Sequence, residues 1–100
     1  MTFSKALEQA RLGKCIARLG WDNMCVFYTE GSQVPFLGLR EETSHALKVV
    51  RGTRNNAVGL SITINPHLDL LCSDGSITCG WVPSQEDMKK DDWYVLREVK

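Results

Sequence analysis

The chain has 100 residues, of which 43% are apolar and 24% are charged, a size and composition typical of one compact domain. Twelve basic side chains balance twelve acidic ones, so the positive field that attracts sequence-independent DNA-binding proteins is missing. No run approaches the roughly 20 apolar residues of a membrane-spanning helix, and the opening MTFSKALEQARLGK lacks the apolar centre of a secretory signal, so we expect a cytosolic protein without nucleic-acid or membrane partners.

The first thirty residues predict a short helix followed by a hairpin. Ser4 is the expected N-cap of a helix over Lys5–Leu12, where apolar residues recur at helical spacing, and Gly13 offers a left-handed stop. Lys14–Arg18 and Met24–Thr29 are rich in residues that favour strands, and the GWDN sequence between them has turn chemistry. We therefore expect two antiparallel strands here.

The stretch Gly31–Gly59 is the least regular part of the sequence. It contains four glycines, a proline and a helical pattern over Arg40–Val50. Leu60–Ile64 then alternates apolar and polar residues as a strand with one covered face does, and Pro66 should end that strand. We predict one domain over residues 1–100, with a variable insertion or flap at about 31–59.

The last third predicts a second hairpin, a short helix and a closing strand. Leu68–Cys72 and Ile77–Trp81 flank an Asp74-Gly75 step, the strongest short hairpin signal. A capping box predicts a helical turn from Ser84 to about Lys90, and Trp93–Leu96 reads as the last strand. The expected fold class is α+β: a short N-terminal helix and a small antiparallel sheet of about five strands, with a short helix before the last strand.

Few residues point to catalysis or metal binding. The four cysteines, at positions 15, 25, 72 and 79, have no CxxC spacing, which favours reduced thiols over disulfides or zinc. His67 and Asp69 would share one face of a strand, an ingredient of acid–base catalysis, but no GxSxG or HExxH motif accompanies them. A histidine that tethers the strand by hydrogen bonds is the favoured interpretation, and we expect no catalytic residue, no metal and no cofactor.

A nucleotide would have to bind without a glycine-rich phosphate loop, because neither GxxxxGK[ST] nor GxGxxG after a strand occurs. Aromatic faces would then hold bases, amide and carboxylate groups would read polar edges, and a basic residue would meet phosphate. The residues with suitable chemistry are Trp21, Phe27, Tyr28, Trp81, Asn23, Gln85, Asp74 and Arg18. Core packing is the alternative role for each tryptophan, and it is the favoured one for Trp93.

Three segments form an ordered set: FSKALEQARLGKCIARLGW at the start, NPHLDLLCSDGSITCGW in the third quarter and VPSQEDMKKDDW near the end. In order and spacing this set resembles the second type of Thoeris anti-defence proteins, a small phage family. The resemblance covers most of the chain outside Gly31–Gly59, where this sequence is longer than the usual member.

The resemblance implies a protein that binds a ligand and does not cleave it. Members act as sponges for the cyclic ADP-ribose isomer made by the defence system, here the glycocyclic isomer, and some also hold cyclic dinucleotides in separate sites. They are similar in forming homotetramers of α+β subunits with signal pockets between subunits. The chain would then work in the cytoplasm of the infected bacterial host.

The matching positions also imply the ligand-binding residues. Together with the aromatic candidate Phe27, they are Trp21, Asn23, Asp74, Trp81, Ser84, Gln85, Asp87 and Met88, and Arg18 or backbone amides would meet the phosphates. Two other functions stay open. One is a protein-interaction module that uses an exposed edge strand and Gly31–Gly59, and the other is a nucleotide hydrolase that uses His67 and Asp69.

Overall fold

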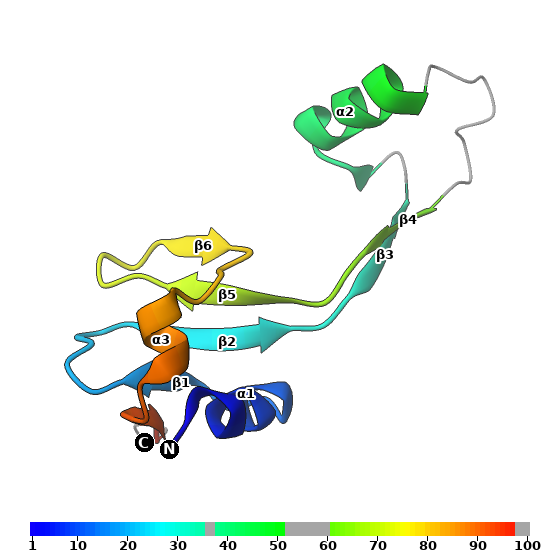
Figure 1. The fold of residues 1–100 in the computed structure, drawn as a ribbon. Helices are drawn as coiled ribbons and strands as arrows, with labels where there is room; N and C mark the ends of the chain where they lie inside the picture. Colours follow the sequence, from blue (N-terminus) through cyan, green and yellow to red (C-terminus); the bar gives the residue numbers. More distant parts are fainter. Residues whose placement is uncertain (36–37, 52–60, 98–100) are drawn as a thin grey trace. The chain divides into compact units, whose positions relative to one another are not determined.

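The computed structural model describes residues 1–35, 38–51 and 61–97 (Figure 1). The chain divides into two compact units, Met1–Glu30 with Pro66–Lys100, and Gly31–Asn65. The first unit contains α1 (Phe3–Arg11), β1 (Ile16–Arg18), β2 (Cys25–Thr29), β5 (His67–Leu71), β6 (Ile77–Cys79), α3 (Gln85–Lys89) and β7 (Trp93–Val95). The second contains β3 (Ser32–Pro35), α2 (Glu41–Arg51) and β4 (Ser61–Ile64).

A five-stranded antiparallel sheet organises the first unit, with the strand order β6-β5-β2-β1-β7. Both predicted hairpins are present, β1 with β2 and β5 with β6. The α+β class, with an N-terminal helix and a five-stranded antiparallel sheet, is therefore confirmed. Assembly into a homotetramer stays a prediction.

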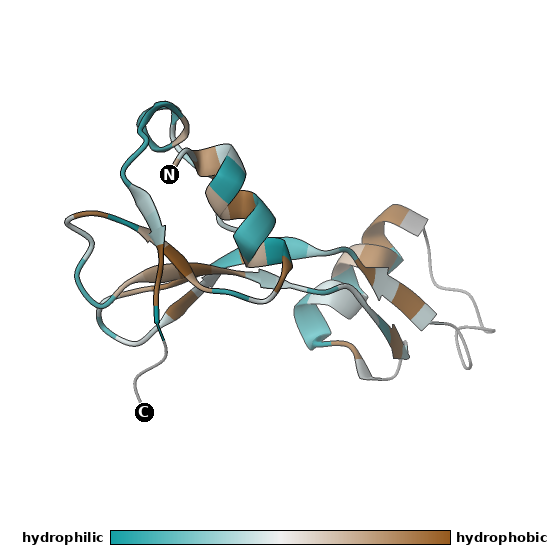
Figure 2. Ribbon diagram, turned by 90° about the horizontal axis from the view of Figure 1, so that it is seen from below, coloured by the Kyte–Doolittle hydropathy of each residue, from teal (hydrophilic) through white to brown (hydrophobic). Residues whose placement is uncertain are grey.

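One face of this sheet forms the core with α1. Ile16 lies opposite Val26 on one side and Val95 on the other, and Val26 lies opposite Leu70. Side chains alternate between the faces of a strand, so these four point the same way, and all of them belong to or pack against the core cluster. Figure 2, coloured by hydropathy, shows α1 banded between hydrophobic and hydrophilic residues, as expected for a helix with one side on a core.

Two alanines explain how closely α1 approaches the sheet. Ala6 and Ala10 are completely buried, as are Ile16 and Val26, and Trp93 is 1% exposed. A methyl side chain lets a helix lie close to a strand, and the buried indole of Trp93 packs in the same core cluster. The core of this unit therefore combines small helical residues with one large aromatic ring.

The opposite face of the sheet carries a different set of residues. Cys25 pairs with Leu71, Phe27 with Asp69, and Tyr94 with Ala17 across neighbouring strands. Strand alternation places these residues away from the core cluster. Part of this face contributes to the pocket described below.

Several predicted boundaries are corrected. The N-cap of α1 is Thr2, which has extended backbone angles and whose hydroxyl accepts a hydrogen bond from the Lys5 amide; Ser4 lies inside the helix. Gly13 has φ 95°, as expected for the residue that stops a helix. The predicted strand Ile77–Trp81 ends at Cys79, because Gly80 turns the chain at φ 75° and its amide donates to Asp69.

The second unit contains a two-stranded antiparallel ribbon, β3 with β4. The sequence predicted no strand at Ser32–Pro35, a polar segment that ends in proline. The Gln33 amide donates to Thr63 Oγ1 at 2.7 Å and its carbonyl accepts from Ser61 Oγ at 3.2 Å, so the pairing depends on a distant partner. The predicted strand Leu60–Ile64 is observed as Ser61–Ile64, and Leu60 lies outside the described residues.

The helix of the second unit spans Glu41–Arg51, one residue later at each end than predicted. Its first turn carries Glu41 and Glu42, which favour the positive end of the helix dipole. The apolar face expected for this helix is only partly covered: Leu39 and Leu47 are half-buried, whereas Ala46 is exposed and Val50 is 80% exposed. The variable insertion at 31–59 stays a prediction.

Candidate functional site

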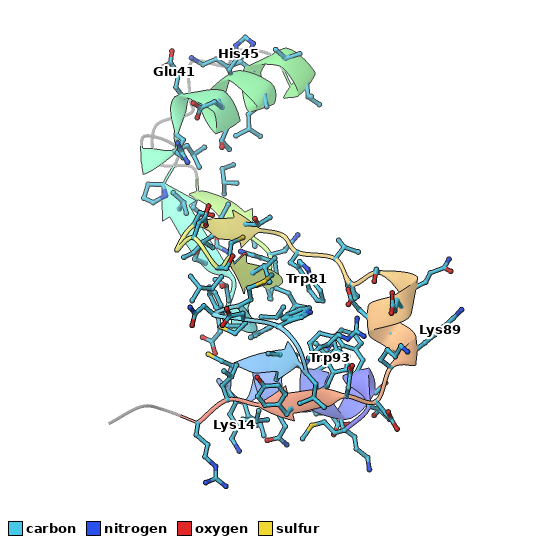
Figure 3. All side chains as sticks on the ribbon, turned by 90° about the vertical axis from the view of Figure 1, so that its left-hand side faces the viewer. Lys14, Glu41, His45, Trp81, Lys89 and Trp93 are labelled. Carbon is cyan, nitrogen blue, oxygen red and sulfur yellow. The ribbon has the colours of Figure 1, made fainter. Side chains whose placement is uncertain are left out.

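Four aromatic rings form a cluster beside the core. Trp93 lies at its centre, with ring centroids 5.1 Å from Phe3, 5.3 Å from Trp21 and 6.3 Å from Trp81. Trp21 and Trp81 also meet edge to face at 6.3 Å, and Figure 3 shows Trp81 and Trp93 among the side chains of the first unit. Trp93 is buried, as predicted, whereas Trp21 and Trp81 are half-buried and keep a surface that a ligand can reach.

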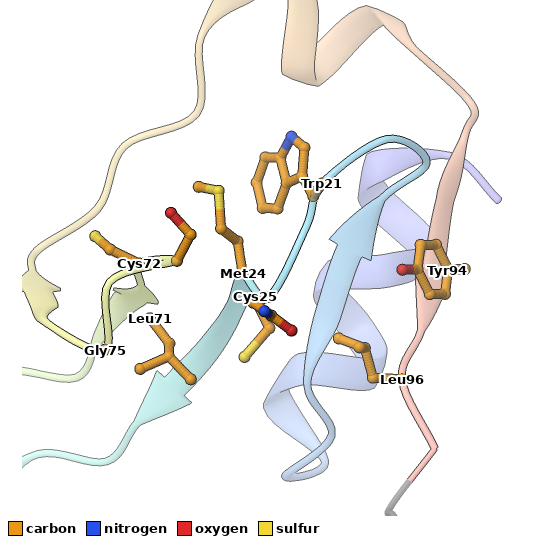
Figure 4. Close-up of a pocket in the computed structure, with 10 residues that line it drawn as sticks. Trp21, Met24, Cys25, Leu71, Cys72, Gly75, Tyr94 and Leu96 are labelled. Atoms are coloured by element: carbon orange, nitrogen blue, oxygen red, sulfur yellow. The ribbon is translucent and has the colours of Figure 1, made fainter.

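A pocket of about 460 Å³ lies next to Trp21 (Figure 4). Three segments meet there: the turn between β1 and β2, the turn between β5 and β6, and the end of the chain around β7. The lining residues are Trp21, Asn23, Met24, Cys25, Leu71, Cys72, Ser73, Gly75, Tyr94 and Leu96. Ligand pockets typically measure about 300–1,000 Å³ and combine an apolar lining with a few polar groups, which this set provides.

The polar groups of the pocket come from turns and from one strand. Asn23 has φ 53°, a left-handed conformation that asparagine tolerates better than most residues, and it allows the tight turn before β2. Burial and the neighbouring Cys15 raise the pKa of Cys25 to about 11, so its thiol is neutral at pH 7 and contributes apolar surface. The amide of Asn23 and the hydroxyls of Ser73 and Tyr94 are thus the groups suited to orienting a ligand.

Arg18 lies at the end of β1 and is surrounded by carboxylates. Its Nε and Nη2 donate to the two oxygens of Asp92 at 3.0 and 3.3 Å, and Nη1 donates to Asp87 Oδ1 at 2.9 Å. A third carboxylate, Glu86 Oε1, lies 3.9 Å from Nη2. These contacts raise the pKa of Arg18 above its usual range, through the Asp92 and then the Asp87 hydrogen bonds, and the Arg18 hydrogen bonds lower the pKa of Asp92.

Asp87 also closes the N-terminus of α3. Its Oδ2 accepts from the Ser84 amide at 2.8 Å, and its own amide donates to Ser84 Oγ at 3.0 Å, which confirms the predicted capping box. Desolvation alone would raise the pKa of Asp87, but the hydrogen bonds from Ser84 and Arg18 outweigh it and the pKa is lowered. A helix of only five residues depends on such contacts at its ends.

Replacing Ser84 by alanine should therefore lower stability by about 1 kcal/mol, the usual cost of losing an N-cap. The matched control is Ser4→Ala, because Ser4 lies exposed inside α1 and caps nothing. Thermal unfolding should show a lower Tm for Ser84→Ala and an unchanged or slightly raised Tm for the control, since alanine is the better helix former. Equal losses of stability in the two variants would contradict the assignment of Ser84 as an N-cap and of Ser4 as an interior helix residue.

Asp69 is a buried carboxylate on β5, and sequence reasoning considered it only as a partner of His67. Its Oδ2 accepts from Thr29 Oγ1 at 2.6 Å, its Oδ1 accepts from the Gly80 amide at 3.1 Å, and His67 Nε2 lies 3.3 Å away. Desolvation opposes ionisation, yet these hydrogen bonds and the nearby imidazole lower the pKa of Asp69. The next amide, Trp81 N, donates to Leu68 O at 2.8 Å, so this carboxylate helps to place Trp81.

The structure brings only some of the predicted binding residues together. Trp21 and Asn23 line the pocket, and Trp81 contacts Trp21. Arg18, Asp87 and Ser84 belong to the carboxylate and capping network. Gln85 and Met88 belong to α3 next to this network, with exposed side chains. Asp74 and Phe27 lie elsewhere: Asp74 accepts from Ser76 in the β5–β6 turn, and Phe27 is half-buried opposite Asp69 on β2.

Sequence reasoning missed several residues of the pocket, notably Leu71, Cys72, Tyr94 and Leu96. Strand alternation could have grouped Cys25, Leu71 and Tyr94 on one face, but only once the strand order was known.

Within residues 1–35, 38–51 and 61–97, no three His, Cys, Asp or Glu side chains converge as metal ligands. In the same ranges, no helix combines the length and apolarity needed to cross a membrane.

The sequence was compared with models of known protein families. The family model of the Thoeris anti-defense 2-like domain matches residues 1–96, which include all elements of both units. Among curated proteins, no relative matches the chain. The family match covers the pocket, the aromatic cluster and the carboxylate network described above.

Proposed function

Because the chain belongs to the Thoeris anti-defense 2-like family, we propose that it binds a cyclic nucleotide signal and withholds it from the defence system without cleaving it. Membership in this family supports a role in Thoeris anti-defence. The proposed ligand is the glycocyclic ADP-ribose isomer, with cyclic dinucleotides as a second class. The proposed place of action is the cytoplasm of the infected bacterial host.

The observation that carries the proposal is the pocket beside Trp21. Its volume of about 460 Å³ is large enough for a base with part of its ribose. An indole face stacks on any nucleobase, while an amide such as that of Asn23 can donate to and accept from a base edge. The apolar lining from Met24, Leu71 and Leu96 suits a planar ring that leaves water.

Sequestration makes a quantitative demand on affinity, because each site removes one ligand molecule. A dissociation constant near 1 nM corresponds to about −12 kcal/mol, and a nucleotide-sized ligand reaches it when a largely preformed site encloses most of its surface. The pocket described here is open to solvent, so by itself it does not enclose most of the surface of such a ligand. We therefore include in the proposal a homotetramer in which a second subunit closes each pocket.

Release of intact ligand separates sequestration from hydrolysis. Both oxygens of Asp69 already accept hydrogen bonds, from Thr29 and Gly80, which favours a structural role over acid–base work with His67. The protein is incubated with glycocyclic ADP-ribose, freed of unbound ligand and denatured by heat, and the released nucleotide is quantified by mass spectrometry. Recovery of intact ligand in stoichiometric amounts supports the proposal, whereas cleavage products would support the hydrolase.

A thermal-shift assay separates sequestration from a protein-interaction module. Ligand at a hundred times its dissociation constant should stabilise the folded protein by about 2.7 kcal/mol. A panel of cyclic ADP-ribose isomers and cyclic dinucleotides should therefore raise Tm for at least one member. Absence of a shift across the panel would favour the interaction module.

Trp21→Ala should weaken binding by about tenfold or more, since stacking of a base on an aromatic side chain contributes roughly 1–3 kcal/mol. The matched control is Leu19→Ala, because Leu19 lies close to Trp21 in sequence but is 69% exposed and does not line the pocket. Isothermal titration calorimetry with glycocyclic ADP-ribose measures both. Equal affinity of Trp21→Ala and wild type would place the ligand elsewhere.

A further inference from the structure

The guanidinium of Arg18 is largely occupied by carboxylates. Three of its five N–H groups donate to Asp92 and Asp87, Glu86 Oε1 lies 3.9 Å from Nη2, and the side chain is only 14% exposed. Three negatively charged carboxylates, those of Glu86, Asp87 and Asp92, therefore surround this one guanidinium. A phosphate that approached Arg18 would meet that negative charge, which disfavours direct contact.

The backbone at Arg18 holds the turn that carries Trp21. The Trp21 amide donates to Arg18 O at 3.1 Å, and the Leu19 amide donates to Asp92 O at 3.0 Å. The Arg18 side chain binds the same Asp92 through two nearly parallel hydrogen bonds, a geometry specific to a guanidinium. Main-chain and side-chain contacts thus fasten the start of the turn to the segment before β7.

The second carboxylate extends this network to the aromatic cluster. The Asp87 side chain accepts a hydrogen bond from Arg18 Nη1, and with Ser84 this residue forms the capping box of α3. Its backbone carbonyl accepts a hydrogen bond from Trp93 Nε1 at 2.8 Å. Trp93 in turn contacts the rings of Trp21 and Trp81. A continuous chain of contacts therefore runs from the guanidinium to the two half-buried indoles.

We propose that Arg18 is a positioning residue, which locks the Trp21 turn and α3 together so that Trp21 and Trp81 are held in place before the ligand arrives. The predicted effect on ligand binding rests on the proposed function. The predicted effect on the ligand-free protein rests on the aromatic cluster alone. Fixing the rings in advance lowers the ordering cost of binding, and such preorganisation raises affinity without a new ligand contact.

The ligand-free test compares Arg18→Met with Arg18→Lys by near-ultraviolet circular dichroism, which reports the coupling of the edge-to-face indoles. Arg18→Met should lose most of the signal, and Arg18→Lys should retain part of it because one ion pair can re-form. Gly13→Ala is the matched control, since it strains a residue with φ 95° whose added Cβ meets nothing within 4 Å. If Arg18→Met loses no more of the near-ultraviolet signal than Gly13→Ala does, the inference is overturned, independently of any result on ligand binding.

The binding test uses Asp92→Asn, which removes the main partner of Arg18 and leaves the arginine in place. If Arg18 positions the rings, glycocyclic ADP-ribose should bind roughly tenfold more weakly to Asp92→Asn, as it should to Arg18→Met. If Arg18 contacts phosphate directly, removing the competing carboxylate should tighten binding, and that result would refute the positioning role. Failure of the wild type to bind, with the spectral loss still present in Arg18→Met, would reject the proposed function while sustaining the positioning role.

Discussion

Trp93→Ala is expected to destabilise the protein by about 3–5 kcal/mol, the range for removing a fully buried large aromatic side chain. Trp93 is 1% exposed, and its ring contacts Phe3, Trp21 and Trp81. The cavity left behind cannot be filled by the sheet residues around it, which are already close-packed. Because small domains are stable by only about 5–15 kcal/mol, this single change removes a large part of the total.

Trp93→Phe separates packing from hydrogen bonding at the same position. Phenylalanine keeps most of the apolar ring but leaves the Asp87 carbonyl without the indole donor, at a cost of about 1–2 kcal/mol. Urea unfolding monitored by far-ultraviolet circular dichroism measures both variants, with Val82→Ala as a control at a residue that is 79% exposed. The assignment of Trp93 to the core fails if Trp93→Ala is no less stable than the control.

Asp69→Asn should cost roughly 3 kcal/mol at pH 7, because a buried, charged acceptor is replaced by a neutral amide that cannot satisfy the same donors. Asp69 is 5% exposed and accepts from Thr29 and Gly80. In either orientation of the asparagine amide, its NH2 group would face the Thr29 hydroxyl or the Gly80 N–H. We also expect weaker placement of Trp81, whose own amide follows directly after Gly80.

The loss caused by Asp69→Asn should depend on pH in a defined direction. The pKa of Asp69 is lowered from the usual 3.8 in the folded protein, so its contribution is complete above that value and disappears as pH falls through the folded-state pKa. The stability difference between wild type and variant should therefore shrink from pH 7 towards pH 2. Asp22→Asn, at an exposed position, is the control, and a difference that stays constant over this range would exclude an ionised Asp69.

Local chemistry explains the elements that could be predicted. Asp74 and Gly75 make their turn from hydrogen bonds within the turn, and Ser84 and Asp87 close their capping box three residues apart. The ordered motifs likewise led to the family that the match over residues 1–96 confirms. In the turn and in the capping box, the stabilising partners are neighbours in sequence.

Other features depend on partners far along the chain, and these were missed. The strand β3 pairs through Gln33 with Thr63, thirty residues away, and Arg18 meets Asp92 across seventy-four. Polarity alone assigned Arg18 to an anionic ligand, because its three carboxylate neighbours become visible only when β1 and the segment before β7 are adjacent. Asp69 was considered only as a partner of His67, because its other partners, Thr29 and Gly80, lie forty and eleven residues away in sequence.

The sequence by itself determined the α+β class, both hairpins, the cap of α3 and the family, because turns, caps and alternation depend on short-range hydrogen bonds and on side-chain period. Only the tertiary structure decided that Trp21 and Trp81 are half-buried beside Trp93, which residues line the pocket, and that Arg18 binds carboxylates. Those outcomes follow from strand order and register, which are set by burial of Ile16, Val26 and Trp93 over the whole first unit.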